Sequence, residues 1–470
     1  MSTTITDYKT LYEKTSPGKL FRIVTIPGVV SMLVSSLYGI VDGIFVGKLL
    51  GSLAFAAVNL VMPFIILDFA IADLVGVGSA VLIAIKLGEK NELAASKIFS
   101  AACLIIIVCG FILGTFLFIF ADKLIGLMGA QGELLELSVE YLRVYAGFSP
   151  FITILFAVDN YLRICGRVRY SMVVNILMAA IGAVLEFLFL YVFRSGIWGA
   201  SLAFCCAMVI CVVIAMIPFI RGKMQLKFVK AQIDKETLRN IFANGSPSFF
   251  NNVAGRIASI LMNLFLLRIG GAIAVSAYGV LMYADGFVQP VLYGLCDSLQ
   301  PAIGYNYGAK NYRRIFAIEK LCFIVCGLLS LIMTIAMFFG RGAVINIFIN
   351  ANEMELINLS IHAFSIFLVT FIFRWVSMAT QSYMSAIGKA GNATIISLST
   401  AFVFPVILLF ALEFLGLDGI WLNMPITCIL AALVSVVILT SHYRKEIRVN
   451  LKSEKAKDND ALKGIKETEN

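Results

Sequence analysis

Charged residues are scarce in this 470-residue chain. Asp, Glu, Lys and Arg make up 14% of it, whereas soluble domains average about 25%. Hydrophobic residues make up 60%, and the mean hydropathy is +0.94. Only ten prolines are present, and no segment before the C-terminal tail has the composition of a flexible linker. This composition excludes a soluble globular protein.

Motifs for catalysis and ATP hydrolysis are also missing. The chain has no GxxxxGK[ST] loop, HExxH, GxSxG or DDxxD, and only two histidines. Its ten cysteines form no CxxC pair and lie in or beside apolar runs. We therefore expect no enzyme, no cofactor and no metal site, with the cysteines packing as small apolar side chains. The charged N-terminus predicts no cleaved signal peptide.

Long apolar runs are what the sequence has in abundance. A helix of about 20 apolar residues spans the roughly 30 Å hydrocarbon core of a bilayer. Windows of that length predict an all-α membrane protein with twelve spans. These lie near residues 20–46, 53–85, 97–120, 139–162, 170–193, 197–220, 243–267, 272–303, 315–339, 358–385, 393–414 and 419–441.

The basic residues predict how these spans are oriented. If the N-terminus is cytoplasmic, the cytoplasmic segments hold 28 of the 37 Lys and Arg, and the outside loops hold five. Loops on the cytoplasmic side of a membrane are enriched in Lys and Arg. We therefore expect a multi-pass protein of the cell membrane with both termini in the cytoplasm. Cytoplasmic Lys and Arg near anionic lipid account for the net positive charge, so we expect no nucleic-acid partner.

The chain also contains an internal repeat. A shift of 220 in the numbering places Pro27 on Pro247 and Gly51 on Gly271. The same shift aligns six further pairs of identical residues: Ala54 with Ala274, Ala57 with Ala277, Met62 with Met282, Gly88 with Gly308, Lys90 with Lys310 and Asn91 with Asn311. We predict two six-helix bundles, 1–220 and 243–441, joined by a cytoplasmic loop at 221–242 and followed by a disordered tail at 442–470. Six spans per half give both halves the same orientation, which is typical of transporters with a site between two bundles.

Several motifs resemble those of the MATE (multidrug and toxic compound extrusion) transporters. Pro27 stands fifteen residues before Asp42 in VDGIFVGKLLGSLAFAAVNL, which is similar to the family's first-helix signature. The segments GIWGASLA (196–203), QPAIGYNYGAK (300–310) and QSYMSAIGKAGNAT (381–394) resemble the family's sixth, eighth and tenth helix regions, and Asn160 to Arg163 with Gly166 resembles the end of its fourth helix. The resemblance covers nearly the whole chain and implies ion-coupled export.

Two acids in the first half are candidates for ion coupling. A charge at the bilayer centre costs at least about 2.5–3.5 kcal/mol, so Asp42 and Glu186 need a reason to persist. Burial beside another acid favours the neutral form, so such a pair can take up and release a proton. The resemblance implies that an acid at Asp42 carries the coupling H+ or Na+, with Glu186 in the same network. Gly182, where relatives often have asparagine, removes an oxygen from a sodium site and favours protons. Asn160 is a candidate for polar contact with this network.

Other charged residues within the spans are candidates for a substrate cavity. They are Asp68, Asp73, Arg256, Asp285 and Arg374, with Asp297 beside them. Each acid can contact substrate or form a structural salt bridge with an arginine, and the sequence leaves both open. Asp159 and Arg163, four residues apart on one helix, are expected to pair locally.

Proline and glycine positions give two further expectations. Pro27 removes a helix hydrogen bond, so we expect it to permit bending of the first helix when Asp42 changes protonation. Gly88, Gly166, Gly308 and Gly388 follow the cytoplasmic ends of spans and are interpreted as helix stops.

Together these features predict a monomeric secondary exporter that moves amphipathic organic cations out of the cell against H+, or alternatively Na+, by alternating access. Intramembrane acids outnumber arginines, which favours cationic substrates. The two arginines, Arg256 and Arg374, leave open a flippase or exporter of a lipid-linked saccharide or metabolite. The expected partners are a small molecule and the lipid bilayer. A receptor or channel explains the repeat and the intramembrane acids less well.

Overall fold

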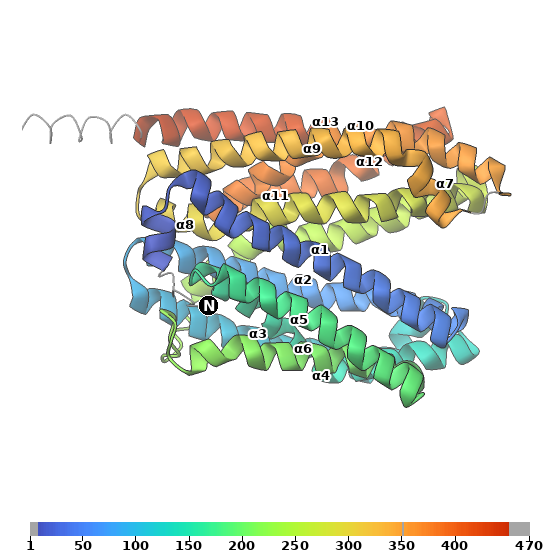
Figure 1. The fold of residues 1–470 in the computed structure, drawn as a ribbon, viewed down its shortest axis with the longest axis horizontal. Coiled ribbons are helices and arrows are strands. Elements are labelled where there is room, and N and C mark those ends of the chain that lie inside the picture. The colour runs from blue at the N-terminus through green and yellow to red at the C-terminus, as the bar shows by residue number, and fades with distance from the viewer. Residues whose placement is uncertain (1–7, 350–351, 451–470) are drawn as a thin grey trace, which may run out of the picture.

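The structure, a computed structural model, describes residues 8–349 and 352–450 and is built from long helices, with no β-strand in this part of the chain. The helices run along the long axis of the molecule in two groups, and α1 crosses between them (Figure 1). Both ends of the described chain lie at one end of the bundle, which we call the terminal end; the other is the distal end. The prediction of an all-helical protein made of two bundles is confirmed.

Six helices form the first bundle. They are α1 (Pro17–Leu49), α2 (Ser52–Gly88), α3 (Glu92–Leu127), α4 (Gly132–Ile164), α5 (Val168–Phe187, continued by η2, Leu188–Val192) and α6 (Gly196–Ile220). Each corresponds to one of the first six predicted spans.

The second bundle contains α7 (Lys235–Asp297), α8 (Gln300–Gly308), α9 (Tyr312–Phe348), α10 (Met354–Ala386), α11 (Ala390–Leu398), η3 (Ser399–Val403), α12 (Phe404–Ala411), η4 (Glu413–Leu415), α13 (Leu417–His442) and η5 (Tyr443–Ile447). Although continuous hydrogen bonding makes α7 one element of 63 residues, Gly271 has a non-helical backbone (φ 67°, ψ −166°). The chain therefore turns at Gly271, and α7 with α8 supplies two spans.

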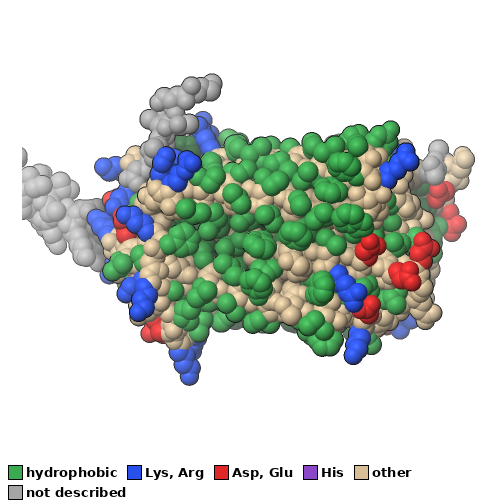
Figure 2. Space-filling model, turned by 90° about the horizontal axis from the view of Figure 1, so that it is seen from below, with side chains coloured by type: hydrophobic (Ala, Val, Ile, Leu, Met, Phe, Trp, Pro, Cys, Tyr) green, Lys and Arg blue, Asp and Glu red, His purple; other side chains and the backbone are tan. Residues whose placement is uncertain are grey.

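A wide apolar belt covers the side of the molecule, with charged side chains gathered towards both ends (Figure 2). Within the described residues, eleven helical stretches are long and apolar enough to cross a membrane, and one of them, Lys235–Gly308, contains the turn at Gly271. Dividing that stretch at the turn gives the twelve spans expected from the sequence. The core between the helices is also apolar, because lipid and the packed interior favour the same side chains.

The turns between spans preserve the repeat. Gly51 and Gly271, which the repeat pairs, both have positive φ (93° and 67°) between the first two spans of their halves. Lys90 and Lys310 follow the same register and both adopt positive φ (63° and 57°), which is unusual for a residue with a side chain. The next residue in each turn, Asn91 or Asn311, caps the following helix through its side chain.

The four glycines interpreted as helix stops divide into two kinds. Gly166 and Gly388 have positive φ (77° and 72°) and do terminate α4 and α10. Gly88 and Gly308 do not, because each is the last residue of a helix without positive φ. A Cβ on Gly88 would lie 2.0 Å from the carbonyl oxygen of Tyr305, so these glycines allow α2 and α8 to approach closely.

The connection between the bundles is shorter than the predicted loop of 221–242, and part of it packs against the first bundle. Helix α7 begins at Lys235, capped by the Asp234 side chain, which accepts a hydrogen bond from the Thr237 N–H (2.6 Å). The preceding segment lies along α3, where the N–H of Val229 donates to the Ser100 hydroxyl (3.0 Å) and Leu226 is fully buried. At the C-terminal end, helix continues to Asn450 rather than ending at 442, and the rest of the expected tail, 451–470, lies outside the described residues.

A short N-terminal segment, residues 8–16, closes over the terminal end. Tyr8 and Tyr12 are buried, and the Tyr12 hydroxyl donates to the backbone carbonyl of Arg163 in the first bundle. The Tyr12 carbonyl accepts hydrogen bonds from two side chains of the second bundle, Asn306 (3.0 Å) and Arg314 (2.7 Å). One residue therefore joins both bundles at this end.

Candidate functional site

A cavity of about 670 Å³ lies between the two bundles. Its lining comes from α1, α2 and α4 of the first bundle and from α7, α8, α10, α12 and α13 of the second. The residues with charge or hydrogen-bonding capacity that line it include Asp73, Asp159, Asn160, Arg163, Asn251, Asn252, Arg256, Asp285, Asp297, Gln300, Arg374 and Gln381. Such a volume is in the range of small-molecule sites.

Four of the charged residues are already paired with each other. Asp159 and Arg163 form the expected pair one helical turn apart (2.7 Å), and Arg374 of α10 pairs with Asp285 of α7. Both pairs are largely buried, so each neutralises charge that would otherwise be costly in a membrane. For Asp285 and Arg374, the choice left open by the sequence is resolved in favour of a salt bridge in this conformation.

Two acids in the cavity have only neutral hydrogen-bond donors. Asp73 of α2 accepts from the Asn252 amide (3.1 Å), and Asp297 of α7 accepts from the Gln300 amide (2.8 Å). Within the described residues neither forms a salt bridge with Lys or Arg. The two carboxyl groups come from opposite bundles and are close enough for their charges to repel. A cation between them would relieve that repulsion.

Arg256 is the remaining charged residue of the cavity. It lines the cavity from α7 and is exposed, with no salt bridge to any described acid. With all groups ionised, two acids without a salt bridge, Asp73 and Asp297, stand against this one arginine. The cavity therefore favours positive charge, although Arg256 offers one contact for an anion.

Asp42 and Glu186 form a separate site inside the first bundle. Asp42 of α1 and Glu186 of α5 are both buried, and their carboxyl groups lie within hydrogen-bonding reach of each other. No N–H or O–H donor of a described residue reaches either oxygen of Glu186 or Oδ1 of Asp42. A hydrogen bond between two carboxyl groups requires a proton on one of them, so the arrangement suits a shared, exchangeable proton.

Tyr38 belongs to this site and was not found from the sequence. It lies one helical turn before Asp42, and its buried hydroxyl has no hydrogen-bond partner among the described residues. Its ring fills the space beside Gly182, where a Cβ would lie 2.7 Å from the ring. The signal that could have found it is the spacing of four from Asp42, which places both side chains on one helix face. Tyr38 thus takes the place that a larger side chain at 182 would need.

The other predicted residues are placed differently. Asp68 does not line the cavity; it is fully buried in the first bundle and accepts hydrogen bonds from Tyr145 (2.8 Å) and Ser149 (2.7 Å) of α4. Asn160 lines the central cavity rather than the Asp42 site, and its amide donates to the carbonyl of Phe156 (3.0 Å). The sequence places these residues within particular spans, whereas the rotation of each helix determines which way they face.

Pro27 lies inside α1, which is helical from Pro17 to Leu49. The next residue, Gly28, packs directly on α7, where a Cβ would lie 2.8 Å from the carbonyl oxygen of Gly294. The place where α1 lacks a backbone hydrogen bond is therefore also the place where it packs on α7. The part of α1 that carries Asp42 follows this place along the chain.

Comparison with known proteins gives the family. The family model MatE matches residues 27–188 and 247–410, one match in each bundle. The chain belongs to the MATE family. Members of this family are membrane transporters rather than enzymes, and the two matches begin at Pro27 and Pro247, which are paired in the internal repeat.

Relatives and solved structures agree with the MATE assignment. The multidrug export protein MepA of Staphylococcus aureus (strain MSSA476) is 25% identical over 434 residues, covering 91% of this chain and 95% of that protein. MepA of Staphylococcus saprophyticus is 26% identical over 439 residues with the same coverage. A solved outward-facing multidrug resistance MATE transporter superposes with a TM-score of 0.88 at 22% identity, covering 96% of this chain and all of that one.

Proposed function

We propose that this MATE transporter exports amphipathic organic cations in exchange for protons by alternating access. The observation that carries the proposal is the separation of two acid sites. Asp73 and Asp297 face a cavity of about 670 Å³ with only neutral donors, whereas Asp42 and Glu186 form a buried carboxyl pair that does not line it.

The first site supplies substrate binding. A cationic group between Asp73 and Asp297 gains contacts to two carboxylates, one from each bundle. Because the acids belong to opposite bundles, rocking one bundle against the other would separate them and weaken binding. Apolar and aromatic neighbours such as Phe156 and Met282 would contact the hydrophobic part of the substrate.

The second site supplies coupling. Protonation of the Asp42 and Glu186 pair removes the repulsion between two buried negative charges, so its proton content can favour one conformation over another. Gly182 provides no side-chain oxygen of its own, which supports protons over sodium. Helix α1 contacts both bundles, so a change at Asp42 can be transmitted through the Pro27 region.

The proposed orientation places the terminal end in the cytoplasm. Lys and Arg side chains gather at this end in Figure 2, as expected for a cytoplasmic face. The N-terminal segment and the contacts of Gly88 and Gly308 hold the bundles together there. Substrate would then leave from the distal end.

Transport by purified protein in liposomes tests the proposal. Efflux of a fluorescent lipophilic cation is measured under a proton gradient or a sodium gradient, each collapsed in turn. Transport should require the proton gradient and be lost in Asp42→Asn and Glu186→Gln. Asp73→Asn should weaken cation binding about tenfold to hundredfold, because a hydrogen bond to a charged group contributes about 1.5–3 kcal/mol. Asp122→Asn, at an exposed surface pair with Arg143, is the matched control.

Each outcome has a clear meaning. If transport requires the sodium gradient instead, the coupling ion is Na+ rather than H+, and the proposal of cation export stands. Unchanged binding in Asp73→Asn and Asp297→Asn would remove the cavity acids from substrate recognition.

One observation favours a second candidate. Arg256 is exposed to the cavity without a described acid partner, which suits an anionic or zwitterionic cargo such as a lipid-linked saccharide or metabolite. If no cation is moved under either gradient and Arg256→Gln abolishes binding of an anionic probe, the flippase or metabolite exporter becomes the better description.

A further inference from the structure

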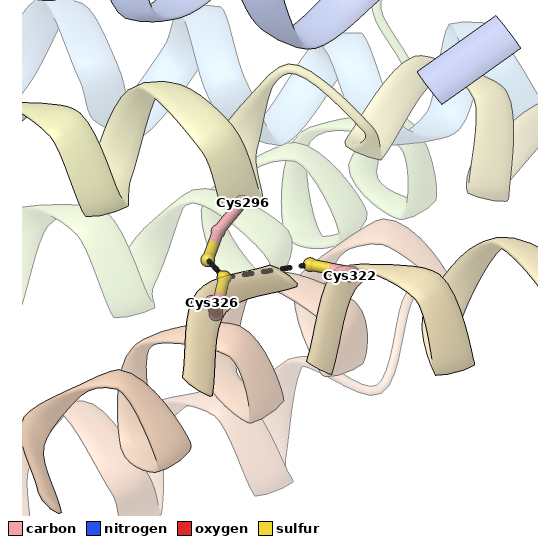
Figure 3. Close-up of side chains that lie close together, drawn as sticks. All are labelled: Cys296, Cys322 and Cys326. Carbon is pink, nitrogen blue, oxygen red and sulfur yellow. Dashed lines mark hydrogen bonds between the residues drawn. The ribbon is translucent and has the colours of Figure 1, made fainter. Parts of the chain in front are cut away.

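Three cysteines from two helices, α7 and α9, meet at one point in the second bundle. Cys296 lies in the last turn of α7, and Cys322 and Cys326 lie one turn apart on α9. All three are buried, and their side chains point towards one another (Figure 3). This cluster is separate from the cavity, because none of its members lines it.

The sulfur positions match those of a metal centre. The Sγ atoms of Cys296 and Cys326 are 3.5 Å apart, those of Cys322 and Cys326 are 3.9 Å apart, and all three lie within 4.8 Å of one another. Metal–sulfur bonds of about 2.3 Å place the sulfurs of a three-thiolate site about 3.8–4.0 Å apart. The site thus needs only small side-chain adjustments to hold an ion.

A buried acid stands beside the cluster. Glu319 lies three residues before Cys322 on the same face of α9 and is about nine-tenths buried. Its Oε1 has no hydrogen-bond partner among the described residues, and the carboxyl group is close enough to interact with Cys322 and Cys326.

We propose that Cys296, Cys322 and Cys326 bind one thiophilic metal ion, such as Zn²⁺. Soft thiolates select ions of this class. Binding breaks three S–H bonds, forms three metal–sulfur bonds and releases three protons to the solvent. A divalent ion with three thiolates carries a single negative charge. This replaces the expectation that these cysteines serve only as apolar packing.

The ion would connect two elements that frame the cavity. Cys296 immediately precedes Asp297, one of the unpaired cavity acids, and the break between α7 and α8 follows at once. A metal between α7 and α9 would fix the last turn of α7. The proposal does not depend on the transported substrate or on the coupling ion.

Cadmium titration of purified, reduced, metal-free protein in detergent tests the site. The ultraviolet thiolate-to-cadmium charge-transfer band and the metal content after gel filtration are measured. We expect one Cd²⁺ per chain, with affinity reduced at least about tenfold in Cys326→Ser and Cys296→Ser, a loss of about 1.4 kcal/mol or more. Cys103→Ser and Cys165→Ser, which replace buried cysteines outside the cluster, should bind like the native protein.

Several results would overturn the proposal. One is equal cadmium binding in Cys326→Ser and native protein. Another is formation of a Cys296–Cys326 disulfide on mild oxidation in a protein that takes up no metal, which would make the cluster a redox pair. Should the serine variants not fold, X-ray absorption of the native cadmium complex decides the question, with three sulfur neighbours expected and one or none excluding the site.

Discussion

Gly88 of α2 and Gly308 of α8 occupy equivalent positions in the two halves, and each packs against the helix that carries the other. A Cβ on Gly88 would lie 2.0 Å from the carbonyl oxygen of Tyr305, and a Cβ on Gly308 would lie 2.0 Å from that of Ile85. Ile85 and Tyr305 are themselves equivalent in the register of the repeat. The closed terminal end therefore rests on a two-fold symmetric contact between backbones.

Adding a methyl group at this contact should force the bundles apart. We expect Gly88→Ala and Gly308→Ala each to destabilise the closed conformation by about 1–3 kcal/mol, as overpacking does elsewhere. Thermal unfolding in detergent measures the effect. Gly279→Ala is the control, because nothing lies within 4 Å of a Cβ at that position and alanine should be neutral or stabilising there. Equal melting temperatures for all three variants would contradict the backbone contact.

The N-terminal segment should slow opening of the terminal end. Tyr12→Ala removes the hydroxyl contact to the Arg163 carbonyl and the buried ring. We expect a cysteine introduced at Ser385, a cavity-lining residue, to react faster with a maleimide in the Tyr12→Ala background. Thr10→Ala changes an exposed residue of the same segment and should leave the rate unchanged. No acceleration in Tyr12→Ala would mean that this segment does not restrain opening.

The Asp285–Arg374 pair should contribute to stability mainly because each charge needs the other. Arg374→Ala leaves a buried carboxylate without its partner, which we expect to cost about 3–5 kcal/mol. The double variant Asp285→Ala with Arg374→Ala should recover most of that loss. Denaturant unfolding in detergent micelles gives the comparison, and a double variant as unstable as Arg374→Ala would show that the arginine acts through other contacts.

Tyr38 and Gly182 should tolerate change only together. Gly182→Asn places a side chain 2.7 Å from the Tyr38 ring, so we expect the single variant to lose stability and transport. Combining it with Tyr38→Ala should restore the fold and add an oxygen beside Asp42 and Glu186. Efflux measured with and without sodium would then show sodium dependence in the double variant. A fully active, stable Gly182→Asn protein would refute the packing argument.

Pro27→Ala should reduce transport while expression stays normal, because the alanine restores a helix hydrogen bond and stiffens α1 next to its contact with α7. Pro63→Ala, which replaces another helix-interior proline in α2, is the matched control. Efflux rate per molecule of protein is the measurement. Transport at the native rate in Pro27→Ala would exclude bending at this residue from the cycle.

Sequence reasoning reached the features that depend on one helix at a time. The apolar runs predicted the spans, and the Asp159–Arg163 pair followed from a spacing of four residues. The repeat register predicted the equivalence of Gly51 and Gly271, which the backbone angles bear out. These signals are local, so hydropathy and periodicity were sufficient to find them.

Features that depend on contact between distant helices were not reached. The sequence could not decide that Arg374 pairs with Asp285 or that Asp68 faces α4 rather than the cavity, because neighbouring helices set which side chains meet. The cysteine cluster was missed because Cys296 is far in sequence from Cys322 and Cys326. The spacing of four between the latter two was the one available signal.

Lys90 and Lys310, in the turn that follows the second span of each half, both have positive φ. A residue with a side chain in this conformation costs about 1–2 kcal/mol, and glycine would remove most of that cost. Lys90 and Lys310 nevertheless hold it in both halves. A lysine near an anionic lipid surface gains about 1 kcal/mol, which is similar in size to the strain. If the terminal end faces the cytoplasm, as proposed, headgroup attraction would offset the backbone strain in the two turns, and these turns would act as a symmetric pair of anchors that hold both bundles at the same depth while they move.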